Sequence, residues 1–146
     1  MSTGTINPIS EGIYPVPVVR LIVPDTSGCV LILRRHGSSH ESGRWCLPGG
    51  KVDYGDTVEQ TVAKELREET SLECTSSTFL FYQDSLPLGP GKMHCINLYF
   101  ECRVTGTVVL NDESSESDWI GPNDLDSYKL AFRHDEGLRQ YWLSNV

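Results

Sequence analysis

The sequence predicts a mixed α/β (α+β) fold, in which a β-sheet is layered with helices. Two observations predict it: short β-branched stretches of strand length recur along the chain, and two segments, around Val58–Val62–Leu66 and over residues 130–142, have helical patterns. The 146 residues, 38% apolar and 22% charged, suit one globular domain. We therefore expect a single domain over residues 15–146, preceded by a flexible, polar N-terminal arm at residues 1–14.

Two strands are predicted in the first part of the chain. Residues 15–23 are rich in Val and Ile, although Pro15 and Pro17 weaken the start of this strand. Residues 29–35 (CVLILRR) form the second strand, after turn-forming residues at 24–28. Because a short turn joins them, we expect the two strands to pair as a hairpin.

The first predicted helix has a narrow apolar stripe, formed by Val58, Val62 and Leu66 at intervals of four residues. Asp56 or Thr57 can cap its N-terminus. Glu59 follows Asp56 by three residues, as in a capping box. These signals place the start of the helix at about residue 57.

The rest of the chain alternates strands with polar connections. Strands are predicted at 76–84 and 93–104, on either side of a Pro/Gly-rich loop at 86–92. Residues 111–118 (NDESSESD) are expected to form an acidic loop, after which a strand resumes at Trp119. A capped turn at 122–125 then precedes the C-terminal helix at 130–142.

Three acids gather beside the apolar stripe of the first helix. At about 100° per residue, Glu65 and Glu69 lie beside or within that stripe, and Glu68 lies just off its other side. Carboxylates so placed repel one another and lose hydration, so they are normally paired or bound to metal. An all-oxygen ligand set favours Mg²⁺ or Mn²⁺. The alternative is a solvated acidic face that pairs with Lys64 and Arg67.

The segment 45–72 resembles the signature of the Nudix hydrolases. That signature is a glycine, five residues, an acid, seven residues and then R-E-U-x-E-E-x-G-U, where U is aliphatic. The matching positions are Gly50, Asp56, Glu65, Leu66, Glu68, Glu69 and Leu72, and the lead-in WCLPGG at 45–50 is similar to the family's W-x-L-P-G-G. Three positions depart from it: Asp56 replaces Glu, Lys64 replaces Arg and Ser71 replaces Gly.

The departures leave the acids that bind metal in the family intact. Lys64 keeps the charge of arginine but loses its planar, bidentate fork, so it would orient the helix acids less tightly. Ser71 lacks glycine's easy access to positive φ, so we expect the helix to end by another route. We expect these changes to affect the efficiency of catalysis rather than the reaction that is catalysed.

The resemblance implies an α/β/α sandwich with a mixed β-sheet, and hydrolysis of the diphosphate linkage in nucleoside diphosphates linked to a second group, with Mg²⁺ or Mn²⁺ as cofactor. It implies that Glu65 and Glu69 are the central metal ligands, that Glu68 supports or bridges, and that the carbonyl oxygen of Gly49 is a further ligand. In the family, the general base is either a signature Glu or a Glu of a later loop. Glu113 and Glu116 lie in such a loop here, and solvated loop acids are the alternative.

Three residues before the signature are candidates for substrate binding. Arg34 and Arg35 end an apolar strand just before a polar loop, where they could face a phosphate or simply be solvated. Trp45 could stack on a base, or it could anchor the glycine turn as a buried residue. Of the histidines, His36 and His40 are expected to be loop residues rather than ligands. His94, near the start of the strand 93–104, could touch substrate, although a structural role is favoured.

The net charge of −8 argues against nucleic acid or an anionic membrane as partner. An anionic substrate would therefore depend on local Arg, Lys and metal charge. The chain has no secretory signal and no run of 18 apolar residues. Its five cysteines are odd in number and contain no C-x-x-C pair, so we expect reduced thiols and a cytoplasmic location.

The resemblance leaves the substrate open between ADP-ribose-like nucleoside diphosphate sugars and nucleoside triphosphates of the house-cleaning type. A proline about fifteen residues beyond the signature weakly marks ADP-ribose-cleaving members, and Pro87 stands there, although it could simply belong to the Pro/Gly-rich loop. We favour the ADP-ribose-like substrate narrowly. A nucleotide sensor without turnover is the third hypothesis, which the intact acids disfavour. A homodimer is compatible with the resemblance, although the N-terminal extension by which larger ADP-ribose enzymes form swapped dimers is not evident.

Overall fold

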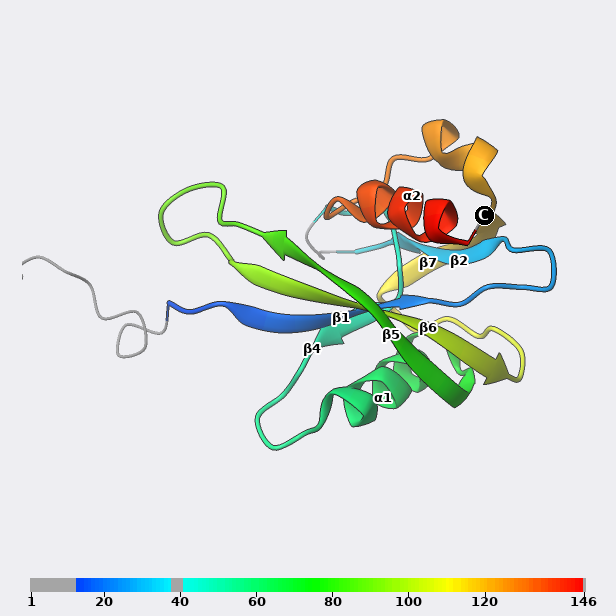
Figure 1. Ribbon diagram of the computed structural model, residues 1–146, viewed down its shortest axis with the longest axis horizontal. Coiled ribbons are helices and arrows are strands. Elements are labelled where there is room, and N and C mark those ends of the chain that lie inside the picture. Colours follow the sequence, from blue (N-terminus) through cyan, green and yellow to red (C-terminus); the bar gives the residue numbers. More distant parts are fainter. Residues whose placement is uncertain (1–12, 38–40, 146) are drawn as a thin grey trace, which may run out of the picture.

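The computed structural model describes residues 13–37 and 41–145 (Figure 1). Within these residues it has seven strands, two α-helices and one 3-10 helix. Most of the predicted arm, residues 1–12, lies outside the described residues, as does His40. Ile13 and Tyr14 are both exposed.

Two small sheets make up the centre of the fold. The four-stranded sheet has the order β4 (Gly49–Lys51), β1 (Val16–Ile22), β6 (Cys95–Thr105) and β5 (Glu73–Ser85). It is mixed, because β1 is parallel to β6 while the β1–β4 and β5–β6 pairs are antiparallel. The antiparallel three-stranded sheet has the order β3 (Trp45–Cys46), β2 (Val30–Arg35) and β7 (Ser114–Ile120).

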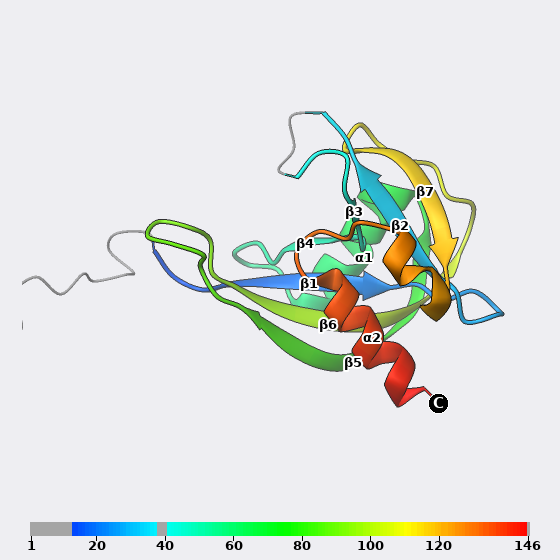
Figure 2. The ribbon, with the colours of Figure 1, turned by 90° about the horizontal axis from the view of Figure 1, so that it is seen from above.

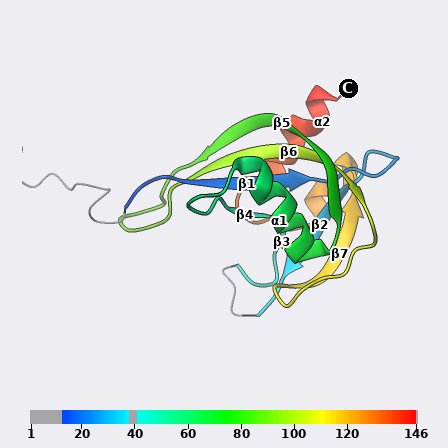
Figure 3. The same ribbon diagram turned by 90° about the horizontal axis from the view of Figure 1, so that it is seen from below.

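Helices cover both sides of the sheets. Helix α1 (Val58–Thr70) lies on one side and α2 (His134–Ser144) on the other, as Figures 2 and 3 show from opposite directions. The 3-10 helix Pro122–Ser127 joins β7 to the segment that leads into α2. The predicted α+β layering with a mixed sheet is therefore confirmed.

The alternation of side chains along β1 and β2 explains this layering. On β1, Val19 and Leu21 pack in the same apolar cluster as Val62 and Leu66 of α1, whereas Ile22 packs in a second cluster with Leu138 of α2. Strand β2 divides in the same way: its buried residues alternate between the two clusters. Strands that are buried on both faces carry continuous apolar runs, which is why 30–33 is uniformly hydrophobic and 18–23 is interrupted only by Arg20.

Two predictions about the strands are wrong. Strands β1 and β2 do not form a hairpin: they belong to different sheets and are joined only by the bridge Pro24–Val30 at the turn. The long parallel contact of β1 with β6 takes its place, and no local signal specifies it. The acidic loop is also shorter than predicted, because β7 begins at Ser114. The polar residues of β7 suit its position at the edge of the three-stranded sheet, because charged side chains on an edge strand prevent pairing with other chains.

The ends of α1 differ from the prediction in detail. Thr57 is the N-cap and forms a capping box with Gln60, instead of Asp56 with Glu59. Ser71 ends the helix at φ 64°, so it adopts the left-handed conformation that glycine normally supplies. The expectation of another route is therefore wrong. The Ser71 hydroxyl donates a hydrogen bond to the carbonyl of Val109 (3.1 Å), which helps to offset the strain.

Candidate active site

Gly49 and Gly50 allow the turn before α1 to lie directly against its neighbours. A Cβ at Gly49 would lie 2.0 Å from the carbonyl oxygen of Val19, on the paired strand β1. A Cβ at Gly50 would lie 2.5 Å from the Glu65 carboxyl carbon. At Gly49 the contact is with backbone, so only glycine fits, whereas a side chain at Gly50 would displace the Glu65 carboxylate. The two glycines therefore bring β4 up to the acids of α1.

The Gly49 position gives a stability prediction. Gly49→Ala should lower the free energy of unfolding by about 3 kcal/mol or more, because the added methyl meets backbone that cannot rotate away. Gly89→Ala is the matched control, since its Cβ would find no atom nearer than 3.9 Å. Urea unfolding of the three proteins measures the difference. Equal stability of the two variants would contradict the close approach at Gly49.

Glu69 and Glu65 face the glycine turn from α1. Glu69 is only 9% exposed, and its carboxylate accepts a hydrogen bond from the Gly49 N–H (3.0 Å). Burial and the charge of Glu65 raise the pKa of Glu69 well above its usual value. Burial also raises the pKa of the half-buried Glu65, and the charge of Glu68 adds to this increase. Two carboxyl groups are thus held together where neither is well solvated.

The other predicted acids divide into two groups. Glu68 is exposed on the same helix and adds to the negative potential at Glu65. The charge of Glu113, in the turn before β7, contributes to the raised pKa of both Glu65 and Glu69, so this residue adds to the negative potential at the two acids. Glu116 does not: it lies on β7 and forms an ion pair with Arg34 (2.8 Å) on the adjacent strand.

The donor set suits a hard divalent cation. The carboxylates of Glu65 and Glu69 supply oxygen ligands beside the glycine turn. A bound cation would stabilise them, because it would neutralise their mutual repulsion. Across the described ranges, no three His, Cys, Asp or Glu side chains are already gathered as a closed metal cage. Mg²⁺ does not require one, because it keeps several waters and binds one or two carboxylates beside substrate phosphates. The residues that would hold it are Glu65 and Glu69, with Glu68 and the Gly49 carbonyl as further candidates.

Arg34 and Trp45 lie together on β2 and β3. The Arg34 guanidinium lies 6.0 Å from the centre of the Trp45 ring, and its Nε donates to the carbonyl of Gly43 (3.2 Å). Trp45 packs edge-on against Tyr128 at 5.2 Å. Its backbone bonds both Lys129 and Ala131, so Trp45 anchors the segment before the glycine turn to the segment before α2.

Arg35, a predicted candidate, lies with two residues that the sequence did not identify, Phe132 and Arg20. Its guanidinium lies 4.8 Å from the centre of the Phe132 ring, and that of Arg20 lies 5.2 Å from the same ring. Burial lowers the pKa of Arg20, and Glu69 is among the groups whose charge opposes this shift. A single arginine within the apolar strand VPVVRLI was the one signal that could have pointed to it.

His134 connects this group to the glycine turn. The buried imidazole accepts a hydrogen bond from the Leu47 N–H through Nδ1 (2.9 Å), two residues before Gly49. Its Nε2 is buried without a hydrogen-bond partner in the part of the chain that the structure describes. Burial, together with the charges of Arg20 and Arg35, lowers the pKa of His134 well below its usual value. The ring is therefore a neutral acceptor that holds the backbone of the turn.

Lys64 faces the loop before α1 rather than the helix acids. Its ammonium group lies 2.8 Å from a carboxylate oxygen of Asp53 and 3.5 Å from one of Asp56. It therefore ties the connection between β4 and α1 to the helix, although its charge also lowers the pKa of Glu65.

This geometry predicts a moderate effect of Lys64 on activity. Lys64→Ala should reduce kcat/KM by a few-fold, because the loop that follows the glycine turn loses its ion pairs to the helix, while Lys64→Arg should preserve or raise activity. Arg67→Ala, one turn further along the same helix, removes an exposed ion pair with Glu73 and serves as control. Steady-state kinetics measures all four proteins. Equal activity would mean that Lys64 is only surface charge.

Comparison with known proteins agrees with this picture. A family model described as "NUDIX domain" matches residues 14–141. The ADP-ribose pyrophosphatase of Methanocaldococcus jannaschii is 31% identical over 130 residues, which cover 88% of this chain and 74% of that protein. The nucleoside triphosphatase NudI of Salmonella paratyphi B is 30% identical over 108 residues, covering 66% of this chain and 77% of that protein.

A solved structure shows the same fold. The MutT protein of Methanosarcina mazei Go1 superimposes with a TM-score of 0.79 at 24% identity, and the alignment covers 90% of this chain and 96% of that one. At this level of identity the likeness concerns the arrangement of sheets and helices rather than the substrate.

Proposed function

The chain belongs to the Nudix hydrolase family, and on this basis we propose that it cleaves the diphosphate linkage of a nucleoside diphosphate joined to a second group, in a reaction that depends on Mg²⁺ or Mn²⁺. The observation that carries the proposal is the contact of Glu65 and Glu69 with the glycine turn. Glu69 accepts a hydrogen bond from Gly49, and the Glu65 carboxylate lies where a Gly50 side chain would be. Enzymes named for such activity are among its relatives, which favours catalysis over a sensor role.

Each group has a distinct role in the proposed reaction. Glu65 and Glu69, supported by Glu68 and the Gly49 carbonyl, would hold the metal ion, which supplies charge neutralisation at the phosphate oxygens and a more acidic water. Glu113 is the better placed of the two later acids to act as general base, because its charge reaches both Glu65 and Glu69. Glu116 is already paired with Arg34.

The cationic groups would bind the substrate's phosphates. Arg35 and Arg20 both contact the Phe132 ring, and Arg20 lies opposite Gly49 in the β1–β4 pair, so two guanidinium groups can meet an anionic substrate in a protein whose net charge is −8. Arg34 remains a candidate, with the Glu116 carboxylate as its competitor. For Trp45, the edge-on packing with Tyr128 favours anchoring over base stacking.

We favour an ADP-ribose-like substrate, because the relative with this name covers 88% of the chain. Hydrolysis of ADP-ribose should give AMP and ribose 5-phosphate. The test is a comparison of kcat/KM for ADP-ribose, other nucleoside diphosphate sugars, and the common and oxidised deoxynucleoside triphosphates. A triphosphate preferred by about tenfold or more, or roughly 1.4 kcal/mol in transition-state free energy, would reject this substrate.

A nucleoside triphosphate is the second candidate, supported by the likeness to the nucleoside triphosphatase NudI. Pyrophosphate as product would identify that activity.

Location and assembly follow from weaker features and are proposals as well. The cysteines are free thiols, which suits the cytoplasm. Within residues 13–37 and 41–145 no helix is long and apolar enough to cross a membrane. A homodimer and the single-domain limits 15–146 stay predictions.

A further inference from the structure

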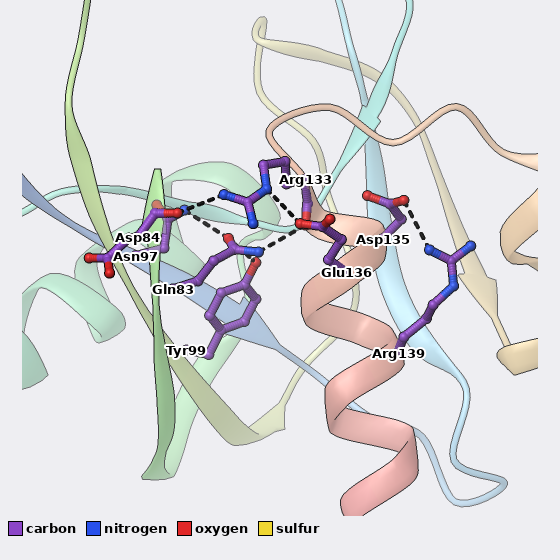
Figure 4. A network of polar contacts seen from close by, with 8 residues as sticks. All are labelled: Gln83, Asp84, Asn97, Tyr99, Arg133, Asp135, Glu136 and Arg139. Carbon is purple, nitrogen blue, oxygen red and sulfur yellow. Dashed lines mark hydrogen bonds and ion pairs between the residues drawn. The ribbon is translucent and has the colours of Figure 1, made fainter. Parts of the chain in front are cut away.

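A chain of side-chain amides crosses the four-stranded sheet beside the candidate active site. The Arg20 Nε on β1 donates to the Asn97 side-chain oxygen on β6 (3.1 Å), and the Asn97 amide nitrogen donates to the Gln83 side-chain oxygen on β5 (3.0 Å). The Gln83 amide nitrogen then donates to the backbone carbonyl of Arg133 (3.2 Å). Figure 4 shows Gln83 at the centre of these contacts, where its oxygen also accepts a hydrogen bond from the Tyr99 hydroxyl (3.1 Å).

These bonds give both amides a fixed orientation. Asn97 is fully buried, and Gln83 is its direct partner across the β5–β6 pair. A rotated Gln83 amide would place its NH₂ group against donors and its oxygen against a carbonyl, so only one orientation satisfies every partner. The position of the Arg20 side chain is therefore fixed relative to β5 through the two amides.

The chain of bonds ends at a strained corner of the backbone. Phe132 and Arg133 have φ values of 58° and 61°, so two consecutive residues other than glycine are left-handed. Such conformations cost free energy and persist only where the surrounding contacts determine them. Here the Gln83 amide holds the Arg133 carbonyl, and the Arg133 guanidinium donates to the Asp84 carbonyl (2.7 Å).

The corner directs three consecutive residues to three different places. Phe132 presents its ring to the guanidinium groups of Arg20 and Arg35. Arg133 turns to β5, while His134 accepts the Leu47 N–H ahead of the glycine turn. The corner is not a simple helix start, because the N-cap residue Arg133 makes no side-chain capping hydrogen bond to α2. The contacts instead fix the position of Phe132 relative to two cationic groups.

We propose that Gln83 and Asn97 are positioning residues for substrate, which fix Arg20 from one side and the Phe132–Arg133 corner from the other. The surface that they fix consists of Arg20, Arg35 and Phe132. This surface would hold the part of the nucleotide that is not bound to metal. Gln83 and Asn97 act through these neighbours and determine how tightly and how selectively the substrate binds. The inference rests on the proposed hydrolase function.

The test compares Gln83→Met with the wild-type protein. Methionine has a similar length but neither donates to the Arg133 carbonyl nor accepts from Asn97 and Tyr99 with comparable strength. We expect KM for the preferred nucleotide to rise by about fivefold or more, with kcat within about twofold. The preference between ADP-ribose and the best competing nucleotide should narrow, while the Mg²⁺ concentration for half-maximal activity should not change.

Gln140→Met is the matched control. Gln140 is an exposed residue of α2 that lines the same surface cleft as Gln83, so the substitution is chemically identical but lies outside the amide chain. KM and substrate preference should remain at wild-type values in this variant. If Gln83→Met folds poorly, Gln83→Glu keeps the size of the side chain but replaces the donor to the Arg133 carbonyl with a charged acceptor oxygen, and it should raise KM in the same way.

The outcomes separate the two proposals. A folded Gln83 variant with an unchanged KM and substrate preference would overturn the positioning role and leave the hydrolase function standing. So would a loss confined to kcat and thermal stability, which is what a purely structural role predicts. If the wild-type protein turns over no nucleotide with Mg²⁺ or Mn²⁺, the proposed function fails and the inference fails with it.

Discussion

Removal of divalent metal with EDTA should abolish hydrolysis, and addition of Mg²⁺ or Mn²⁺ in excess should restore it. The reason is electrostatic: Glu65, Glu69 and Glu113 concentrate negative charge at the place where an anionic phosphate must approach. Without a cation this charge repels the substrate, and no group at the turn compensates the phosphate oxygens or acidifies water. Phosphate release or product chromatography measures the effect.

A stability measurement makes the result specific to the site. The thermal unfolding temperature should change little in EDTA, because the core clusters that flank the sheets consist of apolar side chains and contain no metal-dependent contact. Full activity in metal-free buffer would reject the metal site.

Glu69→Gln is the second change with a large expected effect. Glutamine keeps the shape of the side chain and can still accept the hydrogen bond of the Gly49 N–H, so the turn should stay in place. It removes one negative charge from the buried pair, and with it a proposed metal ligand. We expect kcat to fall by at least about a hundredfold, which corresponds to roughly 2.7 kcal/mol of transition-state stabilisation.

Glu59→Gln is the control for this variant, because Glu59 is an exposed residue in the first turn of the same helix. It should retain wild-type kcat. Urea unfolding should show that Glu69→Gln is folded, and it should be at least as stable as the wild type because it relieves the repulsion from Glu65. A loss of less than about tenfold in kcat would show that Glu69 is not a central ligand.

The acid cluster illustrates what local sequence information can supply. Glu65 and Glu69 are one helical turn apart, and the stripe of Val62 and Leu66 sets which face of α1 is buried. Helical periodicity depends only on the spacing of residues within the segment, so the sequence places both acids at the core side without any distant contact. The same holds for the glycines of the turn, which precede the helix in the chain.

By itself the sequence therefore determined the family, the layering of strands and helices, and the buried side of the acid-bearing helix. Only the tertiary structure decided that β1 pairs with β6 instead of β2 and that Glu116 pairs with Arg34 while the charge of Glu113 raises the pKa of Glu69. It also decided that Arg20 lies over the Phe132 ring and that His134 binds the backbone before the glycine turn. Arg20 and Phe132 are separated by more than 100 residues in the chain. Their contact arises because the strand order brings β1 beneath the corner before α2, and strand order is set by the burial of both sheet faces rather than by any local pattern.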